Sequence, residues 1–405
     1  MPRNTWRQLP VLLFTVTVLI ACTATITPEW VATFNPKASE EPDRLAWFDD
    51  MAVDSYGNIL VAASTIRASM ELHIHDVALV KFDASGNRVW SRALDLSTTG
   101  YDSDDSPLKL VLDSSDNSYM LLEQFRVVSE QESASGNYLI SFDANGNERW
   151  RKDLGEGTEY RTLTLGNDKL YVTGAQTRVF NLAGNQLLAI EHPYHVARSV
   201  DVNMNGDMAL GGGSAVTLFN ASGAQLWHQR ISDRDWAFGE TRFTQQGDLV
   251  AINALEENGG SHLSRFSATG QLLWSRSFSP AYESYGLPGR PAVFEDNRGD
   301  LLLTTSNEDG HRIVKLDAAG RVIWNKREKG IVSDAELSNG ELFIVGDGMN
   351  AKYDSDGNRV AESSLREYVQ ITTGSVAING NRLYAGYSVN QDGTFVLHLS
   401  QYLNQ

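Results

Sequence analysis

The residues best suited to metal chemistry in this sequence are two histidines and an aspartate, His73, His75 and Asp76. Alternate positions on a strand would put both imidazoles on one face, and a carboxylate follows directly. A solvated loop between the second and third strands of the first unit is the favoured interpretation, because no further ligand is evident in the sequence. We therefore predict no resident metal and keep these three residues as the leading candidates for one. His192 and His195 form a similar but weaker pair.

The segment Asp354-Ser-Asp-Gly-Asn358 has the composition of part of a calcium-binding loop. An EF-hand needs a further acidic ligand at its twelfth position, and the segment aligns with the recurring turns described below, so we expect a hairpin turn there. His-Glu-x-x-His, Gly-x-Ser-x-Gly and Walker-type strings do not occur in the sequence. Their absence argues against the common hydrolase and nucleotide-binding sites, and we predict no catalytic residue and no cofactor.

The elements that must carry these residues are defined by a repeat in which Trp follows Gly by four residues. Phe82-Asp-Ala-Ser-Gly-Asn-Arg-Val-Trp90 recurs at 142–150, 219–227, 266–274 and 316–324, with weaker copies at 180–188 and 353–361. β-Branched and aromatic residues flank a short Gly-containing turn, which is typical of a β-hairpin. A second hairpin precedes most copies, so one unit is four antiparallel strands in about 47 residues.

These units predict an all-β fold, an eight-bladed β-propeller of four-stranded antiparallel blades. Seven copies precede a final hairpin and third strand, 376–400, that lacks a fourth strand. Trp30-Val-Ala-Thr-Phe34 is similar to Trp90-Ser-Arg-Ala-Leu94, so we expect this N-terminal strand to pair with the C-terminal blade. Such closure removes free sheet edges. We interpret the recurring Trp as packing between blades rather than as ligand-stacking residues.

Residues 1–21 are typical of a lipoprotein signal peptide, with Arg3 and Arg7 before an apolar run. About ten apolar residues are too few for a membrane-spanning helix, which needs roughly 20. Leu19-Ile-Ala-Cys22 resembles a bacterial lipobox, in which the cysteine is acylated by palmitate-type chains. Cys22, the only cysteine, is therefore the predicted lipid attachment site, followed by a tether at 22–29 and a single propeller domain at 30–405. An ordinary signal peptide with a chance cysteine is the alternative.

The sequence around Cys22 and the net charge bear on location and partners. By resemblance to lipoprotein sorting, Thr23 favours the outer membrane, with the propeller facing the periplasm; the inner membrane is the alternative. Removing Arg3 and Arg7 with the signal peptide changes the net charge from −17 to −19. Such a surface repels phosphate, so we expect no nucleic-acid binding. We also expect the propeller to be monomeric.

The copies resemble the blades of the quinoprotein-dehydrogenase-like propellers, whose repeat also places Trp four residues after Gly. Here the turn is one residue shorter, because Asp83 lies three residues before Gly86. Enzymatic members of that family bind pyrroloquinoline quinone and calcium. Non-enzymatic members include the eight-bladed lipoprotein of the outer-membrane β-barrel assembly machinery. Signal type, blade count and length match the second kind, so the resemblance implies no enzyme activity.

Candidate partner-binding residues lie where each predicted outer strand connects to the next inner strand. These connections should open on one face, which we also expect to carry two long loops, 65–76 and 124–136. Aromatic residues are enriched at binding hot spots; the alternative is that each ring pins its own loop against the next blade. The candidates, which we call the rim aromatics, are Trp47, Tyr101, Tyr160, Tyr194, Trp236, Phe238, Tyr282, Tyr285 and Tyr368.

Three functions fit these features. The first is a lipid-anchored, periplasm-facing scaffold that binds another envelope protein, in outer-membrane assembly or as an accessory to an uptake or transport system. The second is a carbohydrate- or small-ligand-binding propeller that uses the same aromatic residues. The third is a quinone-dependent dehydrogenase.

Overall fold

The computed structural model describes residues 24–25, 28–34, 46–68, 73–94, 96, 103–129, 132–157, 159–192, 196–212, 214–231, 236–255, 260–279, 291–307, 310–346, 349–364, 371–391 and 394–403. Within these ranges the chain forms strands β1–β33 and no helix. In particular, the described residues include no helix long and apolar enough to span a membrane.

The first four blades follow one another along the chain, each a four-stranded antiparallel sheet. Blade 1 is β3 (Ala46–Val53), β4 (Ile59–Ala68), β5 (His73–Phe82) and β6 (Arg88–Leu94). Blade 2 is β7 (Ser103–Leu112), β8 (Ser118–Ser129), β9 (Glu132–Phe142) and β10 (Glu148–Glu156). Blade 3 is β11 (Tyr160–Gly166), β12 (Lys169–Gly174), β13 (Gln176–Asn181) and β14 (Gln186–Glu191). Blade 4 is β15 (Ser199–Val202), β16 (Met208–Gly212), β17 (Ala215–Phe219) and β18 (Gln225–Arg230).

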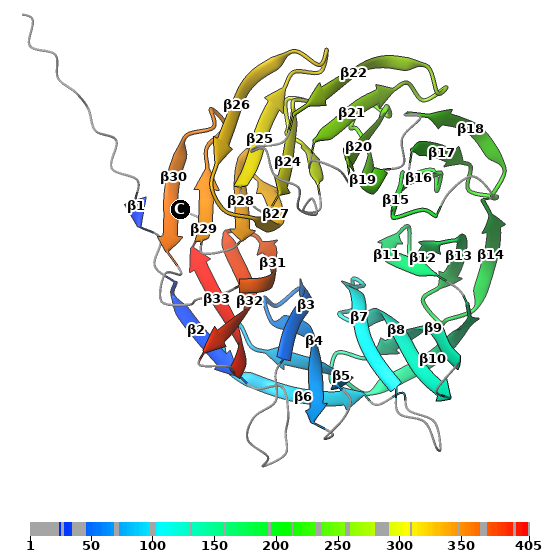
Figure 1. The fold of residues 1–405 in the computed structure, drawn as a ribbon, viewed down its shortest axis with the longest axis vertical. Coiled ribbons are helices and arrows are strands. Elements are labelled where there is room, and N and C mark those ends of the chain that lie inside the picture. Colours follow the sequence, from blue (N-terminus) through cyan, green and yellow to red (C-terminus); the bar gives the residue numbers. More distant parts are fainter. Residues whose placement is uncertain are drawn as a thin grey trace, which may run out of the picture.

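Four further blades complete the ring, which confirms the predicted eight-bladed propeller (Figure 1). Blade 5 is β19 (Trp236–Phe243), β20 (Leu249–Leu255), β21 (Ser261–Phe266) and β22 (Leu272–Phe278). Blade 6 is β23 (Ala292–Glu295), β24 (Leu301–Asn307), β25 (Gly310–Leu316) and β26 (Val322–Glu328). Blade 7 is β27 (Val332–Ser338), β28 (Glu341–Gly346), β29 (Met349–Tyr353) and β30 (Arg359–Ser364). Blade 8 is β31 (Ile371–Asn379), β32 (Arg382–Gln391), β33 (Thr394–Leu403) and the N-terminal β2 (Trp30–Phe34).

The N-terminal strand closes the ring as predicted. β2 pairs antiparallel with β33, from Trp30 opposite Gln401 to Phe34 opposite Leu397. The Trp30 indole covers Gly86 of blade 1, and its Nε1 donates a hydrogen bond to the Ala84 carbonyl, 3.1 Å away. The N-terminal strand β2 thus pairs with the C-terminal strand β33 and packs its Trp30 against blade 1.

The repeated turn explains the spacing of the sequence pattern. In blade 1 the Asp83 carboxylate accepts hydrogen bonds from the backbone N–H of Ser85 and Asn87, both at 2.9 Å. Gly86 has φ 82°, a conformation that side chains disfavour. The other six copies keep a glycine with φ between 76° and 85° at this position: Gly146, Gly184, Gly223, Gly270, Gly320 and Gly357. Asp354 makes the same turn contacts, which confirms a hairpin turn there.

A β-bulge after each repeated turn aims the Trp side chain at the next blade. In blade 1, Lys81 pairs with Trp90 but Phe82 pairs with Arg88, so Val89 has no cross-strand partner. The Trp90 ring then covers Gly146 of blade 2. Five further tryptophans cover the glycine of the following blade, namely Trp30, Trp150, Trp227, Trp274 and Trp324. In blade 3 Leu188 takes this place, over Gly223. The predicted packing role of the Trp series is confirmed.

The hydrophobic core lies between blades. The buried apolar residues that the structure describes form eight clusters, and each cluster combines residues of two neighbouring blades. The cluster of blades 8 and 1, for example, packs Tyr384 and Leu399 against Phe48 and Ile59. Because every blade shares its core with both neighbours, stability depends on the closed ring.

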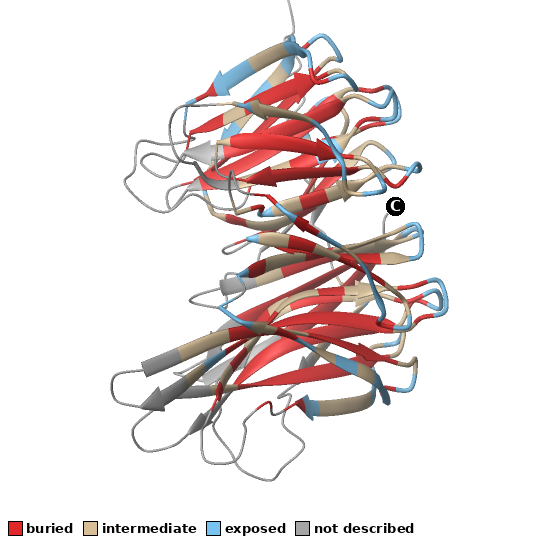
Figure 2. Cartoon of the chain, turned by 90° about the vertical axis from the view of Figure 1, so that its right-hand side faces the viewer, coloured by how far each residue is buried: buried red, intermediate tan, exposed pale blue. Residues whose placement is uncertain are grey.

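The two faces of the ring differ in the length of their connections. The tight turns, both the repeated ones and those between first and second strands, lie together at one face (right side of Figure 2), here called the turn face. We call the opposite face the connection face. The prediction of two long loops there is wrong. β4 and β5 pair as far as Ala68 opposite His73, and β8 and β9 as far as Ser129 opposite Glu132. Cross-strand pairing therefore extends both hairpins through segments that lack a clear strand pattern.

Candidate functional site

Of the nine rim aromatics, seven lie outside the described residues or have side chains that are not described. Tyr101, Tyr194, Tyr282, Tyr285 and Tyr368 lie outside the described residues, and of Trp236 and Phe238 only the strand pairing in β19 is described. Their role in partner binding stays a prediction. Trp47 and Tyr160 are described with their side chains.

Tyr160 does not belong to the surface. Its side chain is 1% exposed and packs in the core between blades 2 and 3. Arg178 lies over the ring, with its Cζ 5.6 Å from the centroid, and burial raises the pKa of Tyr160 to about 12. For this residue the alternative interpretation, a ring that pins its own loop against the neighbouring blade, is the correct one, because a partner cannot reach a buried ring.

Trp47 lies beside His75 in a cluster where blades 1 and 2 meet on the connection face. The two ring centroids are 4.9 Å apart, in an edge-on arrangement. His75 Nδ1 contacts Asp104 Oδ1 of blade 2, whose side chain is 40% exposed. We call Trp47, Asp49, His75, Asp76, Asp104 and Asp105 the blade 1–2 cluster.

The predicted metal candidates have other surroundings. His75 is paired with Asp104, Asp76 is 7% exposed, and the side chain of His73 is outside the described residues. The described residues include no group of three or more His, Cys, Asp or Glu side chains that could hold a metal ion.

Two carboxyl groups of the blade 1–2 cluster, the buried Asp105 and the partly exposed Asp49, have a raised pKa. Burial raises the pKa of Asp105 to about 6, against hydrogen bonds from the Leu96 N–H and the Ser103 hydroxyl. Asp105 Oδ1 has no hydrogen-bond partner among the described residues. Burial also raises the pKa of Asp49 to about 7, although Ser64 donates to it twice. Perturbed acids of this kind concentrate at functional sites.

A second polar group surrounds the ring axis, where the eight inner strands face one another (Figure 1). Among the described residues, four inner strands carry a carboxylate that accepts a backbone N–H of the next blade. The pairs are Asp50 with Leu110 at 2.7 Å, Asp201 with Phe243 at 2.7 Å, Glu240 with Val293 at 3.2 Å and Asp334 with Val376 at 2.9 Å. These acids link neighbouring blades at their inner edges, and sequence reasoning missed them.

The axis is acidic and only partly neutralised. Lys109 Nζ lies 3.1 Å from Asp50, and Arg242 Nε donates to Glu240 at 2.6 Å. The Lys109 and Arg242 side chains are 42% and 50% exposed, so solvent reaches them. Burial raises the pKa of Glu336 to about 7, and the nearby Asp334 carboxylate adds to this shift.

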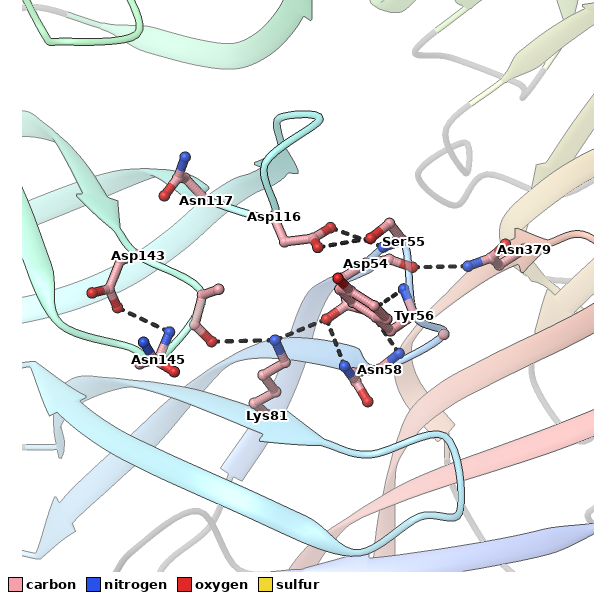
Figure 3. A network of polar contacts seen from close by, with 12 residues as sticks. Asp54, Ser55, Tyr56, Asn58, Lys81, Asp116, Asn117, Asp143, Asn145 and Asn379 are labelled. Carbon is pink, nitrogen blue, oxygen red and sulfur yellow. Dashed lines mark hydrogen bonds and ion pairs between the residues drawn. The ribbon is translucent and has the colours of Figure 1, made fainter.

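The turn face carries a buried ion-pair network that links three blades (Figure 3). Lys81 Nζ lies 2.8 Å from Asp54 and donates to the Ala144 carbonyl of blade 2 at 3.2 Å. The Asp116 carboxylate accepts the Ser55 hydroxyl at 2.8 Å. Burial opposes ionisation of Asp54, but hydrogen bonds from Lys81 and Asn58 outweigh it and lower its pKa.

The cation of this network recurs at the position before the opening residue of the repeat. Lys315 pairs with Asp296 at 2.7 Å, Arg265 with Asp248 at 2.9 Å and Lys352 with Glu341 at 2.8 Å, and all three cations are buried. A Lys or Arg in register before the repeated turn was the sequence signal for these pairs. Their repetition identifies the turn-face network as structural.

The eight blades with their Gly–Trp repeat define a propeller of the quinoprotein-like class. A family model described as outer membrane protein assembly factor BamB matches residues 135–279 and 259–397, and the chain belongs to this family. The expected family resemblance is confirmed.

Solved structures share the fold. BamB from Moraxella catarrhalis is 13% identical to this chain, with a TM-score of 0.57. The alignment covers 93% of this chain and 100% of that one. The Dos1 propeller is 14% identical to this chain, with a TM-score of 0.64. The alignment covers 93% of this chain and 95% of that one. Among curated proteins, none matches this chain.

Proposed function

We propose that this protein is a lipid-anchored scaffold at the outer membrane that faces the periplasm and holds another envelope protein during outer-membrane assembly. The observation that carries the proposal is the match of the BamB family model over most of the ring. The closed ring supports it, because a rigid scaffold holds binding residues in place. Acylation of Cys22 within the lipobox-like segment supplies the anchor.

The partner binds at the connection face. The residues of that face that a partner can reach, and that do not belong to the repeat, include Trp47, a half-exposed Asp104 and the partly exposed Asp49. An aromatic ring beside carboxylates suits a basic side chain, through stacking and charge together. The acidic net charge of the chain favours the same kind of partner.

Binding is favoured over catalysis by the geometry of the described residues. His75, the imidazole nearest to the surface acids, is already engaged by Asp104 and Trp47. The carboxyl groups with a raised pKa, Asp49 and Asp105, accept hydrogen bonds from their own blade or from the linker that precedes blade 2. These contacts suit a surface of fixed shape and charge.

The test is a cross-linked pull-down from native membranes with the acylated protein as bait. Cys22→Ala removes the anchor. A rim variant combines substitutions on the connection face, and a control variant changes two exposed residues of the turn face, Tyr56 at 80% and Met204 at 96% exposure. The rim variant is Trp47→Ala, Tyr101→Ala, Asp104→Asn, Trp236→Ala and Tyr285→Ala.

We expect wild type and the turn-face control to recover the same membrane protein, and the rim variant to lose it. Recovery by the rim variant at wild-type level would contradict the proposed binding face. Recovery of a bound glycan in place of a protein would favour the carbohydrate-binding alternative.

A further inference from the structure

The outer strand of blade 6 exposes large apolar side chains. Val322 and Ile323 at the start of β26 are 47% and 52% exposed, and Ile323 is the bulge residue without a cross-strand partner. The neighbouring blade 5 has the same arrangement, with Leu272 at 51% and Leu273 at 47% exposure. Among the described residues, only these two blades expose two consecutive large apolar side chains on an outer strand. Together they form an apolar strip on one flank of the ring.

The same flank is basic, although the protein is acidic. Residues 317–329 contain four cations, Arg321, Lys326, Arg327 and Lys329, and two acids, Asp317 and Glu328, in a chain of net charge −17. Asp317 lies 2.7 Å from Arg321. The Glu328 carboxylate is already paired, since it accepts a hydrogen bond from the Tyr353 hydroxyl at 2.9 Å and lies 3.3 Å from Arg359. We call Arg321, Val322, Ile323, Lys326 and Arg327 the blade 6 flank.

The excess of positive charge also affects the interior. Arg327 and the buried Arg312 both donate to the Ser279 hydroxyl, at 3.3 and 3.2 Å. Burial lowers the pKa of Arg312 to about 10, and the charge of Arg327 adds to this effect. An anion in front of the flank would relieve this repulsion.

The N-terminal segment brings the anchor to this part of the ring. β1 (Ala24–Thr25) pairs in parallel with β30, with Ala24 opposite Ala361, and adds a fifth strand to blade 7 (Figure 1). Part of the predicted tether is therefore a strand. Cys22 precedes Ala24 by two residues, a reach of at most about 7 Å. The acylation position is thus confined to the outer edge of blade 7.

Blades 7 and 6 are joined at this outer edge. Trp324 of β26 covers Gly357 of blade 7, and its Nε1 donates to the Ser355 carbonyl at 3.0 Å. The chain enters β1 from the turn-face side, because β1 runs parallel to β30. Val322 and Ile323 lie at that same end of β26, next to the turn at Gly320. The anchor and the apolar strip therefore lie at one edge of the ring.

We propose that the blade 6 flank lies on the anionic phospholipid surface, so that the propeller stands edge-on with its axis parallel to the membrane. This orientation rests on the lipid anchor of the proposed function. Charges beyond about 8–10 Å are screened, so the local positive charge outweighs the negative charge of the distant blades. Apolar side chains beside cations suit the headgroup boundary. Both faces of the ring then remain open to a partner.

The orientation is tested with a fluorescent label on the acylated protein, in vesicles of phosphatidylcholine and phosphatidylglycerol. Acylated Cys22 leaves no free thiol, so a new cysteine is labelled alone. Ile323→Cys places the label on the flank. Leu187→Cys places it at the equivalent bulge of blade 3, equally exposed at 52% but on the opposite side of the ring. Lipids with a quencher near the headgroup should quench the label at position 323 and leave the label at 187 unchanged.

A second arm measures the charge contribution without the acyl chains. Flotation of the Cys22→Ala protein with the same vesicles should weaken about fivefold on Arg327→Gln, as expected for one basic residue near an anionic surface. Arg88→Gln, at an exposed position of blade 1, is the matched control and should change little. Vesicles of phosphatidylcholine alone should abolish the difference.

The outcomes separate the orientation from the anchor. An acylated protein that floats but shows no quenching at position 323 overturns the edge-on orientation and leaves the anchor intact. Energy transfer between labels at 323 on two copies would assign the flank to a dimer contact and also overturn it. An acylated protein that does not float overturns the anchor and the orientation with it.

Discussion

The turn face and the connection face of this ring are built from different kinds of contact. On the turn face the same arrangement recurs, with an Asx-type turn, a glycine such as Gly86 and the Trp of the preceding blade. Among the described residues of the connection face, the His75–Asp104 pair and the buried Asp105 occur once. Repeated contacts hold the ring together, whereas contacts that occur once are the ones free to specify a partner.

Loss of the closing strand should have the largest effect on stability. Deletion of residues 30–34 removes the outer strand of blade 8 and exposes the edge of β33, so we expect aggregation and the loss of a cooperative thermal transition. Trp30→Ala alone should destabilise by about 3 kcal/mol, in the range for large-to-small aromatic substitutions. Trp227→Ala makes the same change at an internal junction. Equal costs would show that closure works like any other blade contact, and an unchanged midpoint for the deletion would disprove closure.

Removal of one buried cation on the turn face should have the next largest effect. Lys315→Met removes the buried cation 2.7 Å from the buried Asp296 carboxylate, which then faces the exposed Arg298 at 3.5 Å, and breaking a buried pair costs about 3–5 kcal/mol. Arg321→Gln is the control, because its pair with Asp317 is exposed and should contribute little. Urea unfolding measures both. Similar midpoints for the two variants would contradict a structural role for the buried network.

The smallest expected effect is on the pH dependence of stability, which should differ between an acid of the connection face and an acid of the turn face. The pKa of Asp105 is raised to about 6 in the folded state, so its contribution to stability is largest below pH 4 and is lost as the pH rises through 6. Asp105→Asn should therefore gain stability relative to wild type between pH 4 and 7. Asp113 on the turn face has a lowered pKa, because hydrogen bonds from Asn117 and Tyr119 outweigh its burial, so its contribution is lost at low pH.

Asp113→Asn should accordingly show the opposite trend, with its deficit largest near neutral pH and disappearing as the pH falls below about 4. Urea unfolding of both variants and of wild type across this pH range measures the two trends. If the stability difference from wild type changed with pH in the same direction for both variants, the acids of the two faces would not differ as proposed.

The sequence by itself determined the blades, their number and the closure of the ring. Each depends on local chemistry with a fixed period: Asp83 bonds to its own turn, Gly86 takes the positive φ, and Trp90 follows at constant spacing. Trp30 could be recognised as the missing outer strand because it repeats that pattern.

Only the tertiary structure decided which polar groups meet. Asp50 reaches Leu110, His75 reaches Asp104, and β1 pairs with β30 across more than 300 residues. These contacts join different blades, and their partners depend on how the sheets twist and close rather than on any local pattern. The burial of Tyr160 and the lengthened β4–β5 hairpin escaped prediction for the same reason, since side-chain environment and strand ends are set by neighbouring blades.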